Sequence, residues 1–285
     1  MADINLRETL ELERLEVNLF RGTSPTPDAG RIYGGQVIAQ SLLAAYATVE
    51  DRVCHSLHCY FIRPGDPKIP IIFEVDRSRD GHSFTTRRVI AVQHGRQIFN
   101  LAASFQVQET GFEHQAEMPQ TVGPAGLPDL AEALGRVDPH LSEEEQRPTY
   151  LKPIEIRFID TLEPNADGSP LAPCQRAWFR IAHPLPDQLP WHQVAMAYAS
   201  DMGLLSTSLR PHGSVWNSPN MQGASLDHAM WFHRPTDFTQ WHLYVMDSPS
   251  ASGARGLNRG TIFRHDGTLV ASAAQEGLIR YHAPK

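Results

Sequence analysis

The sequence predicts an α+β protein built from two tandem copies of one structural unit, and three observations lead to this prediction. An aromatic-Phe-x-Arg-Pro-x-Asp motif occurs twice, at residues 60–66 and 231–237, an offset of 171 residues. A segment with helical spacing of apolar residues precedes each copy, and a Gly-started apolar strand follows each at nearly the same offset. Repetition of a motif together with its flanking elements indicates an internal duplication.

The first half is predicted to contain one helix followed by a strand meander. After the pair Gly34-Gly35, residues 36–46 place Val37, Ile38 and Leu42 at helical spacing among small residues. Four segments rich in β-branched and aromatic residues follow, separated by turn signals, at residues 56–62, 69–75, 83–93 and 97–107. We expect this meander to wrap around the helix.

Between Glu109 and Pro148 the chain no longer shows the β-branched and aromatic segments that predict strands, and it contains Pro, Gly and a run of Glu residues instead. One short helix, at residues 130–134, is predicted within this linker. The second half repeats the plan, with strands at residues 154–160 and 176–181, a helix from about Trp191 to Ser208 and a strand at residues 267–279. The expected domains are a first unit at residues 1–110, a linker at residues 111–150 and a second unit at residues 151–285.

Composition and charge narrow the possible functions. The formal charge of −7 and the isoelectric point near 6.0 argue against a nucleic-acid-binding protein, because phosphate contacts need clustered Lys and Arg. No apolar run approaches the ~20 residues of a membrane span, and the start of the chain lacks the pattern of a signal peptide. The three cysteines, Cys54, Cys59 and Cys174, have no metal-ligand spacing. We therefore expect a cytoplasmic protein with reduced thiols and without a metal or another cofactor.

A carboxylate interrupts the apolar face of the second predicted helix. Val194, Tyr198 and Leu205 share that face, and the position that completes their spacing is Asp201. Burial of an ionised Asp without partners costs several kcal/mol, so Asp201 must be hydrogen-bonded, paired or directed into a cavity. A role as a cap or salt-bridge partner near the end of the helix explains the residue equally well.

Two further polar residues stand where the strand pattern predicts an inner face or a strand end. Gln275 has the parity of small apolar residues in its strand, and Ser225 opens the strand that leads into the second motif. Each has an ordinary explanation, solvation for Gln275 and turn formation for Ser225. At the motif offset the first half carries Cys54 and Ser104 at these places, and its helix carries no acid. Only the second half therefore offers a carboxylate, a hydroxyl and an amide together.

Several segments, in the same order along the chain, resemble the bacterial acyl-CoA thioesterase II family. These segments are Gly34 to Gln40, His55 to Gly65, Arg79 to Phe84, Ser225 to Pro235 and Ser250 to Gly256. The resemblance extends from about Glu11 to Arg280, and several independent motifs make it more specific than any one of them. It implies a double hotdog fold, in which each unit has a central helix wrapped by an antiparallel sheet and the two sheets join side by side. It also implies the hydrolysis of fatty acyl-CoA to free fatty acid and coenzyme A.

The resemblance assigns the catalytic roles to Asp201, Ser225 and Gln275, which match the family's Asp, Thr or Ser, and Gln. Ser225 departs mildly from the commoner Thr, since Ser keeps the hydrogen-bonding group but loses the methyl that restricts the rotamer. In the implied mechanism, Asp201 is a general base for a water molecule that Ser225 and Gln275 hold against the thioester carbonyl. Backbone N–H groups at the Gly-introduced N-terminus of one central helix would stabilise the oxyanion.

Two other functions stay open: an enoyl-CoA hydratase of the same fold and a non-catalytic acyl-CoA-binding protein. A hydratase needs an Asp/His pair at the start of its helix, whereas Asp201 lies far along the predicted one. Histidines near the motifs, His58, His228 and His233, rank second as catalytic groups. Four arginines are weak candidates for binding coenzyme A phosphates: Arg79, Arg87, Arg88 and Arg255. We also expect a homo-oligomer, a dimer or a tetramer, formed through the remaining faces and edges of the joined sheets.

Overall fold

The computed structural model describes residues 5–25, 30–146, 148, 152–163, 165, 167, 169–213 and 220–282. The strands of the first half are β1 (Glu13–Glu16), β2 (Leu19–Gly22), β3 (Val53–Phe61), β4 (Ile71–Asp80), β5 (Phe84–Gln93) and β6 (Arg96–Gln106). Those of the second half are β7 (Ile154–Phe158), β8 (Cys174–Ile181), β9 (Met221–Ser225), β10 (Asp227–Phe232), β11 (His242–Ser252), β12 (Arg255–Arg264) and β13 (Leu269–Tyr281). The helices are α1 (Leu6–Leu10), α2 (Gly34–Tyr46), α3 (Leu130–Val137), α4 (Glu143–Gln146), α5 (Leu189–Ser200) and the 3₁₀ helix η2 (Leu205–His212).

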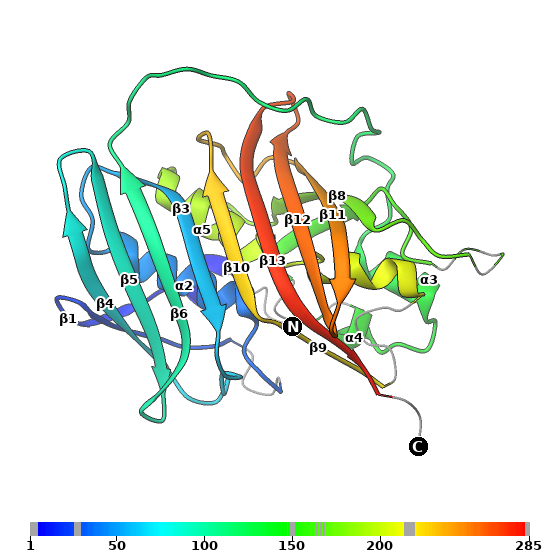
Figure 1. The fold of residues 1–285 in the computed structure, drawn as a ribbon, viewed down its shortest axis with the longest axis horizontal. Coiled ribbons are helices and arrows are strands. Elements are labelled where there is room, and N and C mark those ends of the chain that lie inside the picture. Colours follow the sequence, from blue (N-terminus) through cyan, green and yellow to red (C-terminus); the bar gives the residue numbers. More distant parts are fainter. Residues whose placement is uncertain are drawn as a thin grey trace.

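The strands of the described residues form one antiparallel sheet that covers two central helices (Figure 1). Its order is β1-β2-β4-β5-β6-β3-β10-β13-β12-β11-β8-β7, and β9 pairs with β13. The two motif strands, β3 and β10, meet at the centre, where Leu57 pairs with Met230 and Cys59 with His228. The two sheets therefore join side by side, which confirms the predicted α+β class and the double hotdog arrangement.

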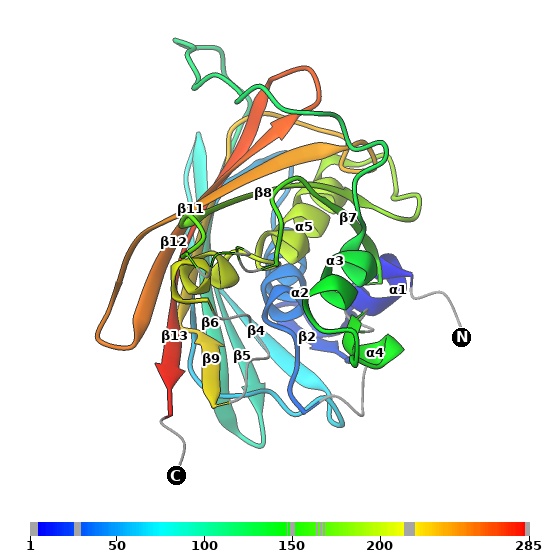
Figure 2. The same ribbon diagram turned by 90° about the vertical axis from the view of Figure 1, so that its right-hand side faces the viewer.

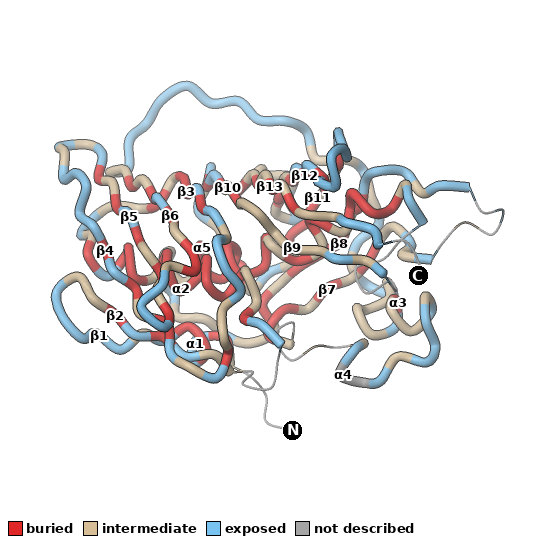
Figure 3. Tube along the Cα trace, turned by 60° about the horizontal axis from the view of Figure 1, so that its bottom comes forward, coloured by how far each residue is buried: buried red, intermediate tan, exposed pale blue. Residues whose placement is uncertain are grey.

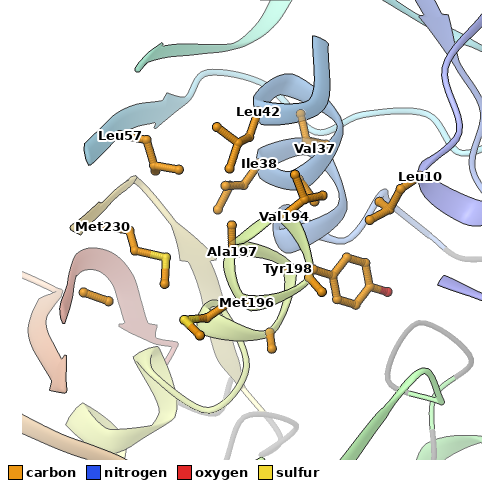
Figure 4. Packing of buried hydrophobic residues seen from close by; sticks show 14 of the residues in the cluster. Leu10, Val37, Ile38, Leu42, Leu57, Val194, Met196, Ala197, Tyr198 and Met230 are labelled. Carbon is orange, nitrogen blue, oxygen red and sulfur yellow. The ribbon is translucent and has the colours of Figure 1, made fainter. Parts of the chain in front are cut away.

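The two central helices, α2 and α5, pack together along one face of the sheet (Figure 2). Figure 4 shows Val37 and Ile38 of α2 beside Val194 and Ala197 of α5, within the main hydrophobic core. Small residues permit this close approach, because a Cβ atom on Gly35 would lie only 2.3 Å from a backbone oxygen of α5. Burial is concentrated on these helices and on the strand faces towards them (Figure 3).

The central helices run antiparallel to each other, and hydrogen bonds join them at both ends. The Tyr33 hydroxyl, just before α2, donates to the Tyr198 carbonyl oxygen near the C-terminus of α5 at 2.9 Å. At the other end, Gln193 near the start of α5 hydrogen-bonds the Tyr46 hydroxyl and donates from Nε2 to Cys54 O at 2.9 Å. The N-terminus of each helix therefore lies beside the C-terminus of the other.

The second central helix is shorter than the sequence predicts. α5 ends just before Asp201, its C-cap residue, and Gly203 then takes a φ of +74°, which breaks the helical path. The chain continues as the separate helix η2, so Leu205 does not extend the face of α5. The expectation of one helix from about Trp191 to Ser208 was wrong, because the apolar spacing continues across a turn that periodicity does not detect.

The segment between the two units contains the predicted short helix. α3 begins at the predicted residue and runs to Val137, beyond the predicted end. A capping box starts it: Asp129 Oδ1 accepts from the Glu132 N–H at 2.9 Å, and Glu132 Oε2 accepts from the Asp129 N–H at 3.1 Å. Among the described helices, none combines the length and apolar character needed to cross a membrane.

Candidate active site

The three polar residues singled out in the sequence meet at one point of the structure. Ser225 Oγ donates a hydrogen bond to Asp201 Oδ1 at 3.2 Å, and Gln275 Nε2 donates to the same oxygen at 2.6 Å. Asp201 follows α5, Ser225 ends β9 and Gln275 lies within β13. Hydrogen bonds to an ionised acceptor are stronger than neutral ones, so these contacts hold the carboxylate in one orientation.

Asp201 is both a helix-terminal residue and part of a cavity wall, which joins the two interpretations left open by the sequence. A carboxylate at the C-terminus of its own helix is electrostatically unfavourable, because the helix dipole is negative there. A simple stabilising role as a cap does not explain such a placement. The position favours a chemical role for the carboxylate.

Ser225 is positioned by a strand that sequence reasoning did not separate from the next one. β9 pairs with β13, with Ser225 opposite Gly277, and β10 begins only at Asp227. Between the two strands, Leu226 donates its N–H to Glu276 O at 2.9 Å. Ser225 is therefore the last residue of β9, and it does not open the motif strand as expected.

Gln275 lies on the inner face of β13 and is completely buried, which confirms the parity argument. Its equivalent in the first half is Ala103, and the equivalence with Ser104 was wrong. Pairing with the motif strands makes Phe99 of β6 equivalent to Ala271 of β13, an offset of 172 residues. Because side chains alternate along a strand, this shift of one residue turns Ser104 to the other face of the sheet.

The N-terminus of α2 faces Asp201. A Cβ atom placed on Gly34 would lie 2.7 Å from Asp201 Oδ2. The residue before the helix, Tyr33, provides no side-chain cap, and the hydrogen bonds inside the helix begin with the N–H of Gln36. The N–H groups of Gly34 and Gly35 therefore belong to the unpaired first turn, where a helix attracts negative charge. Of the two central helices, α2 is therefore the one whose N-terminus lies beside the carboxylate of Asp201.

A cavity of about 510 Å³ is bordered by Gly34, Asp201 and Ser225. Its walls are mostly apolar and come from both halves and from the intervening segment, for example Phe61 and Phe99, Leu134 of α3, and Phe179 of β8. Pockets of this size and character are typical of small-molecule sites with a few polar groups at one place. The first half therefore contributes a wall and a helix terminus to the site.

Neutral polar groups surround the buried side of the carboxylate. The His228 ring is buried, with Nε2 2.9 Å from Ser200 Oγ. Burial lowers the pKa of His228 to about 4, although the nearby Asp201 charge acts in the opposite direction, so the ring is neutral at pH 7. Burial also raises the pKa of the Cys59 thiol and of the Tyr244 hydroxyl, and both stay protonated.

Other residues considered from the sequence have structural partners. His58 packs its ring against Trp231 on the outer face of the sheet, with ring centroids 5.2 Å apart. Arg87 is buried and donates to the Thr48 hydroxyl at 2.9 Å and to its carbonyl oxygen at 3.0 Å, so phosphate binding by Arg87 is excluded. In the part of the chain that the structure describes, no three His, Cys, Asp or Glu side chains gather to hold a metal ion.

Sequence reasoning did not single out two of the cations that border the cavity, Arg31 and Arg210. Arg31 borders it and donates from both terminal nitrogens to Gly223 O at 3.2 Å, which ties the loop before α2 to β9. The residue stands in a loop without periodicity, so no pattern singled it out. Arg255, which the sequence did suggest for phosphate binding, forms an exposed ion pair with Glu276 at 2.9 Å.

Comparison with known proteins places the chain in a family. Residues 154–278 match the acyl-CoA thioesterase family, and residues 23–106 match the acyl-CoA thioesterase N-terminal domain. Acyl-CoA thioesterase 2 of Haemophilus influenzae is 40% identical over 285 residues, covering 99% of each chain. Human acyl-coenzyme A thioesterase 8 is 41% identical over 98% of this chain and 90% of its own.

Solved structures agree in fold. Acyl-CoA thioesterase II TesB2 from Mycobacterium marinum superposes with a TM-score of 0.80 at 42% identity, covering 98% of this chain and 99% of its own. A protein with a hot dog fold from Alicyclobacillus acidocaldarius reaches a TM-score of 0.77 at 19% identity, over 98% of both chains. By these matches in sequence and fold, the chain belongs to the acyl-CoA thioesterase family.

Proposed function

We propose that the protein hydrolyses fatty acyl-CoA to free fatty acid and coenzyme A at the cavity beside Asp201. The geometry of the carboxylate carries this proposal. Its Oδ1 accepts hydrogen bonds from Ser225 and Gln275, while its Oδ2 faces the N-terminus of α2 at Gly34. Asp201 is thus a base held in one orientation, and the backbone N–H groups at the start of α2 lie beside it. This combination suits the attack of water on a carbonyl group.

In the proposed reaction, Asp201 accepts a proton from water as the water oxygen bonds to the thioester carbonyl carbon. Ser225 and Gln275 hold the carboxylate and orient the water. When the tetrahedral intermediate collapses, the carbon–sulfur bond breaks and the coenzyme A thiolate leaves, and the proton on Asp201 returns to the thiolate or to solvent. A thiolate is a good leaving group, so the mechanism does not require a strong general acid.

The oxyanion of the intermediate would be stabilised by the N–H groups of Gly34 and Gly35 at the start of α2. A helix N-terminus carries partial positive charge, and preorganised donors of this kind contribute about 10²- to 10³-fold to turnover. The apolar wall of the cavity would hold the acyl chain, and Arg31 at its border is suitably charged for the phosphates of coenzyme A.

The geometry disfavours the hydratase alternative. The histidine near the start of α5, His192, is buried and accepts a hydrogen bond from the Phe238 N–H at 3.1 Å. It lies at the end of α5 opposite to Asp201, so the two side chains cannot act on one double bond.

The test is Asp201→Asn, which keeps the shape of the side chain but cannot take a proton. We expect thiol release from palmitoyl-CoA to fall by at least about 10²-fold, with an unchanged melting temperature. Asp247→Asn is the control, because it removes an exposed carboxylate that pairs with Arg259. Wild-type turnover in folded Asp201→Asn would refute the mechanism, and hydration of enoyl-CoA without thiol release would favour the hydratase.

We also propose that the chain forms a homo-oligomer through the outer face of its central strands. Tyr60 of β3 and Trp231 of β10 have the same parity across the paired strands, and they are 61% and 36% exposed there. Large exposed apolar groups in one area are typical of a protein interface. Light scattering of the wild type and of Tyr60→Glu is the test, and a monomeric wild type at micromolar concentration would contradict the proposal.

A cytoplasmic location is part of the same proposal. Cys54, Cys59 and Cys174 are free thiols, and the last is exposed, which suits a reducing compartment. Cell fractionation with an antibody against the protein tests the location, and recovery in a membrane or secreted fraction would contradict it.

A further inference from the structure

Asn258 is a completely buried polar residue next to Gln275. The two residues pair directly across β12 and β13, so their side chains point to the same inner face of the sheet. Asn258 Nδ2 donates to Gly256 O at 3.2 Å, but Asn258 Oδ1 has no hydrogen-bond partner among the described residues. The same holds for Gln275 Oε1, the oxygen of the amide that donates to Asp201.

A third unpaired acceptor lies in the same row. Ala229 pairs with Ala274, so the preceding residue of β10, His228, comes beside Gln275 on the inner face. Ser200 Oγ donates to Ala197 O at 2.9 Å, so the His228 ring must donate in its own contact with Ser200. This leaves His228 Nδ1, which has no partner among the described residues, as an acceptor.

These acceptors cannot satisfy one another, because each needs a donor. Rotation of the Gln275 amide would not help, since it would place Oε1 against the Asp201 carboxylate. Rotation of the Asn258 amide would break its bond to Gly256 O. Buried acceptors without donors are costly, and a water molecule with several polar neighbours is the usual solution.

The first half offers an internal comparison. Arg87 pairs with Ala103 across β5 and β6, as Asn258 pairs with Gln275 across β12 and β13, and the two pairs occupy equivalent places. Arg87 reaches the end of α2 directly, with bonds to the hydroxyl and carbonyl oxygens of Thr48. In the second half the longer side chain of the pair is Gln275 of β13, and it is Gln275 that reaches Asp201 at the end of α5. Asn258 of β12 is shorter than Arg87 and does not make the equivalent contact.

We infer that Asn258 is a positioning residue for the reaction, and this inference rests on the proposed thioesterase function. A buried water molecule donates one hydrogen to Asn258 Oδ1 and the other to Gln275 Oε1, and a second water molecule donates to His228 Nδ1. The first water molecule fixes the Gln275 amide with Nε2 towards Asp201. Donation to Oε1 also polarises the amide and strengthens its bond to the carboxylate. Asn258 therefore acts on catalysis only through Gln275.

A double-mutant cycle with Gln275→Ala tests this inference. Asn258→Leu is similar in shape and removes the acceptor, and it should lower kcat for palmitoyl-CoA about tenfold with KM changed less than twofold. In the Gln275→Ala background the same substitution should change kcat less than about twofold, because its effect is transmitted by Gln275. Asn258→Ser, whose hydroxyl supplies an acceptor in place of the amide oxygen and leaves room for a further water, should recover most of the lost kcat.

Ser248→Ala is the matched control, because Ser248 is a buried residue whose hydroxyl donates to Leu257 O, one residue before Asn258. It should leave kcat unchanged. Equal effects of Asn258→Leu in both backgrounds, or no effect in either, would overturn the inference. If Asn258→Leu does not fold, Asn258→Val, a smaller apolar residue that also lacks the acceptor, replaces it in the same cycle with the same expected and overturning outcomes. Failure of the proposed function is distinguishable, since wild type would then release no thiol and Asp201→Asn would match it.

Discussion

Replacing Gly34 with Ala tests whether the gap between α2 and Asp201 is where the reaction takes place. The added Cβ atom would lie 2.7 Å from Asp201 Oδ2 and 3.0 Å from Cε1 of Phe61. Carbon and oxygen atoms in weak contact normally stay about 3.3–3.6 Å apart, so the carboxylate must move by roughly 0.6–0.9 Å. That displacement works against the two hydrogen bonds that hold Asp201 Oδ1.

A catalytic group displaced by about 1 Å can lose roughly 10²-fold in rate, and we expect a loss of this size in kcat. Stability should change little, because Ala is favoured over Gly in a helix by up to about 1 kcal/mol and this offsets part of the clash. Turnover of palmitoyl-CoA by thiol release, with melting temperature measured on the same samples, separates the two effects.

Gly30→Ala is the matched control. It introduces the same methyl group four residues earlier, where a Cβ atom would meet no described residue within 4 Å apart from its neighbours in the chain. Its kcat should equal that of the wild type. A folded Gly34→Ala variant with wild-type kcat would show that neither the gap nor the start of α2 takes part, and the assignment of the oxyanion donors would have to be abandoned.

Three further predictions follow from the structure. Ser225→Ala should lower kcat more than it raises KM, since the hydroxyl orients the carboxylate and the water; a change in KM alone would show a role in substrate binding. Ser104→Ala should leave turnover unchanged and lower the free energy of unfolding by about 1 kcal/mol, because Ser104 Oγ only bonds His55 Nε2 at 2.8 Å; a large loss of activity without unfolding would contradict this. Burial lowers the pKa of both His228 and His242 from 6.5 to about 4, so the unfolded chain binds more protons than the folded one between these values. The stabilising contribution of the two neutral histidines should therefore be complete above pH 6.5, and the free energy of unfolding should decrease towards pH 4 by on the order of 3 kcal/mol for each histidine. Equal free energies of unfolding from urea titrations at pH 7 and pH 4.5 would refute this prediction.

Local periodicity predicted those elements whose burial follows a regular pattern. The apolar spacing around Val37 predicted α2, and the parity of Gln275 placed its side chain on the inner face of β13. Both predictions succeeded because helices and strands expose their faces at fixed intervals. The family resemblance implied that the two sheets join side by side, and they do so through the two motif strands, β3 and β10, at the sheet centre.

The failures lie where the chain leaves a regular path. The helical path ends after Asp201, where Gly203 has a positive φ. Only Leu226 separates β9 from β10, and the alternation of side chains along a strand does not reveal so short a break. A difference of one residue in the spacing between the motif strand and the following strand misassigned Ser104. The approach of Gly34 to Asp201 joins residues far apart in sequence, so only the packed fold shows it.

The antiparallel pair of central helices has a consequence for the history of the chain. Two identical units related by a two-fold axis would form two identical sites, each with the N-terminus of one helix and the C-terminus of the other. Fusion into one polypeptide removes the requirement that the two sites stay alike. At one end the carboxylate of Asp201 faces a cavity, while at the other Arg87 and Tyr46 fill the corresponding region with internal hydrogen bonds. Fusion thus allowed one of the two equivalent sites to be filled by internal hydrogen bonds of Arg87 and Tyr46, while the other kept the carboxylate of Asp201 and its cavity.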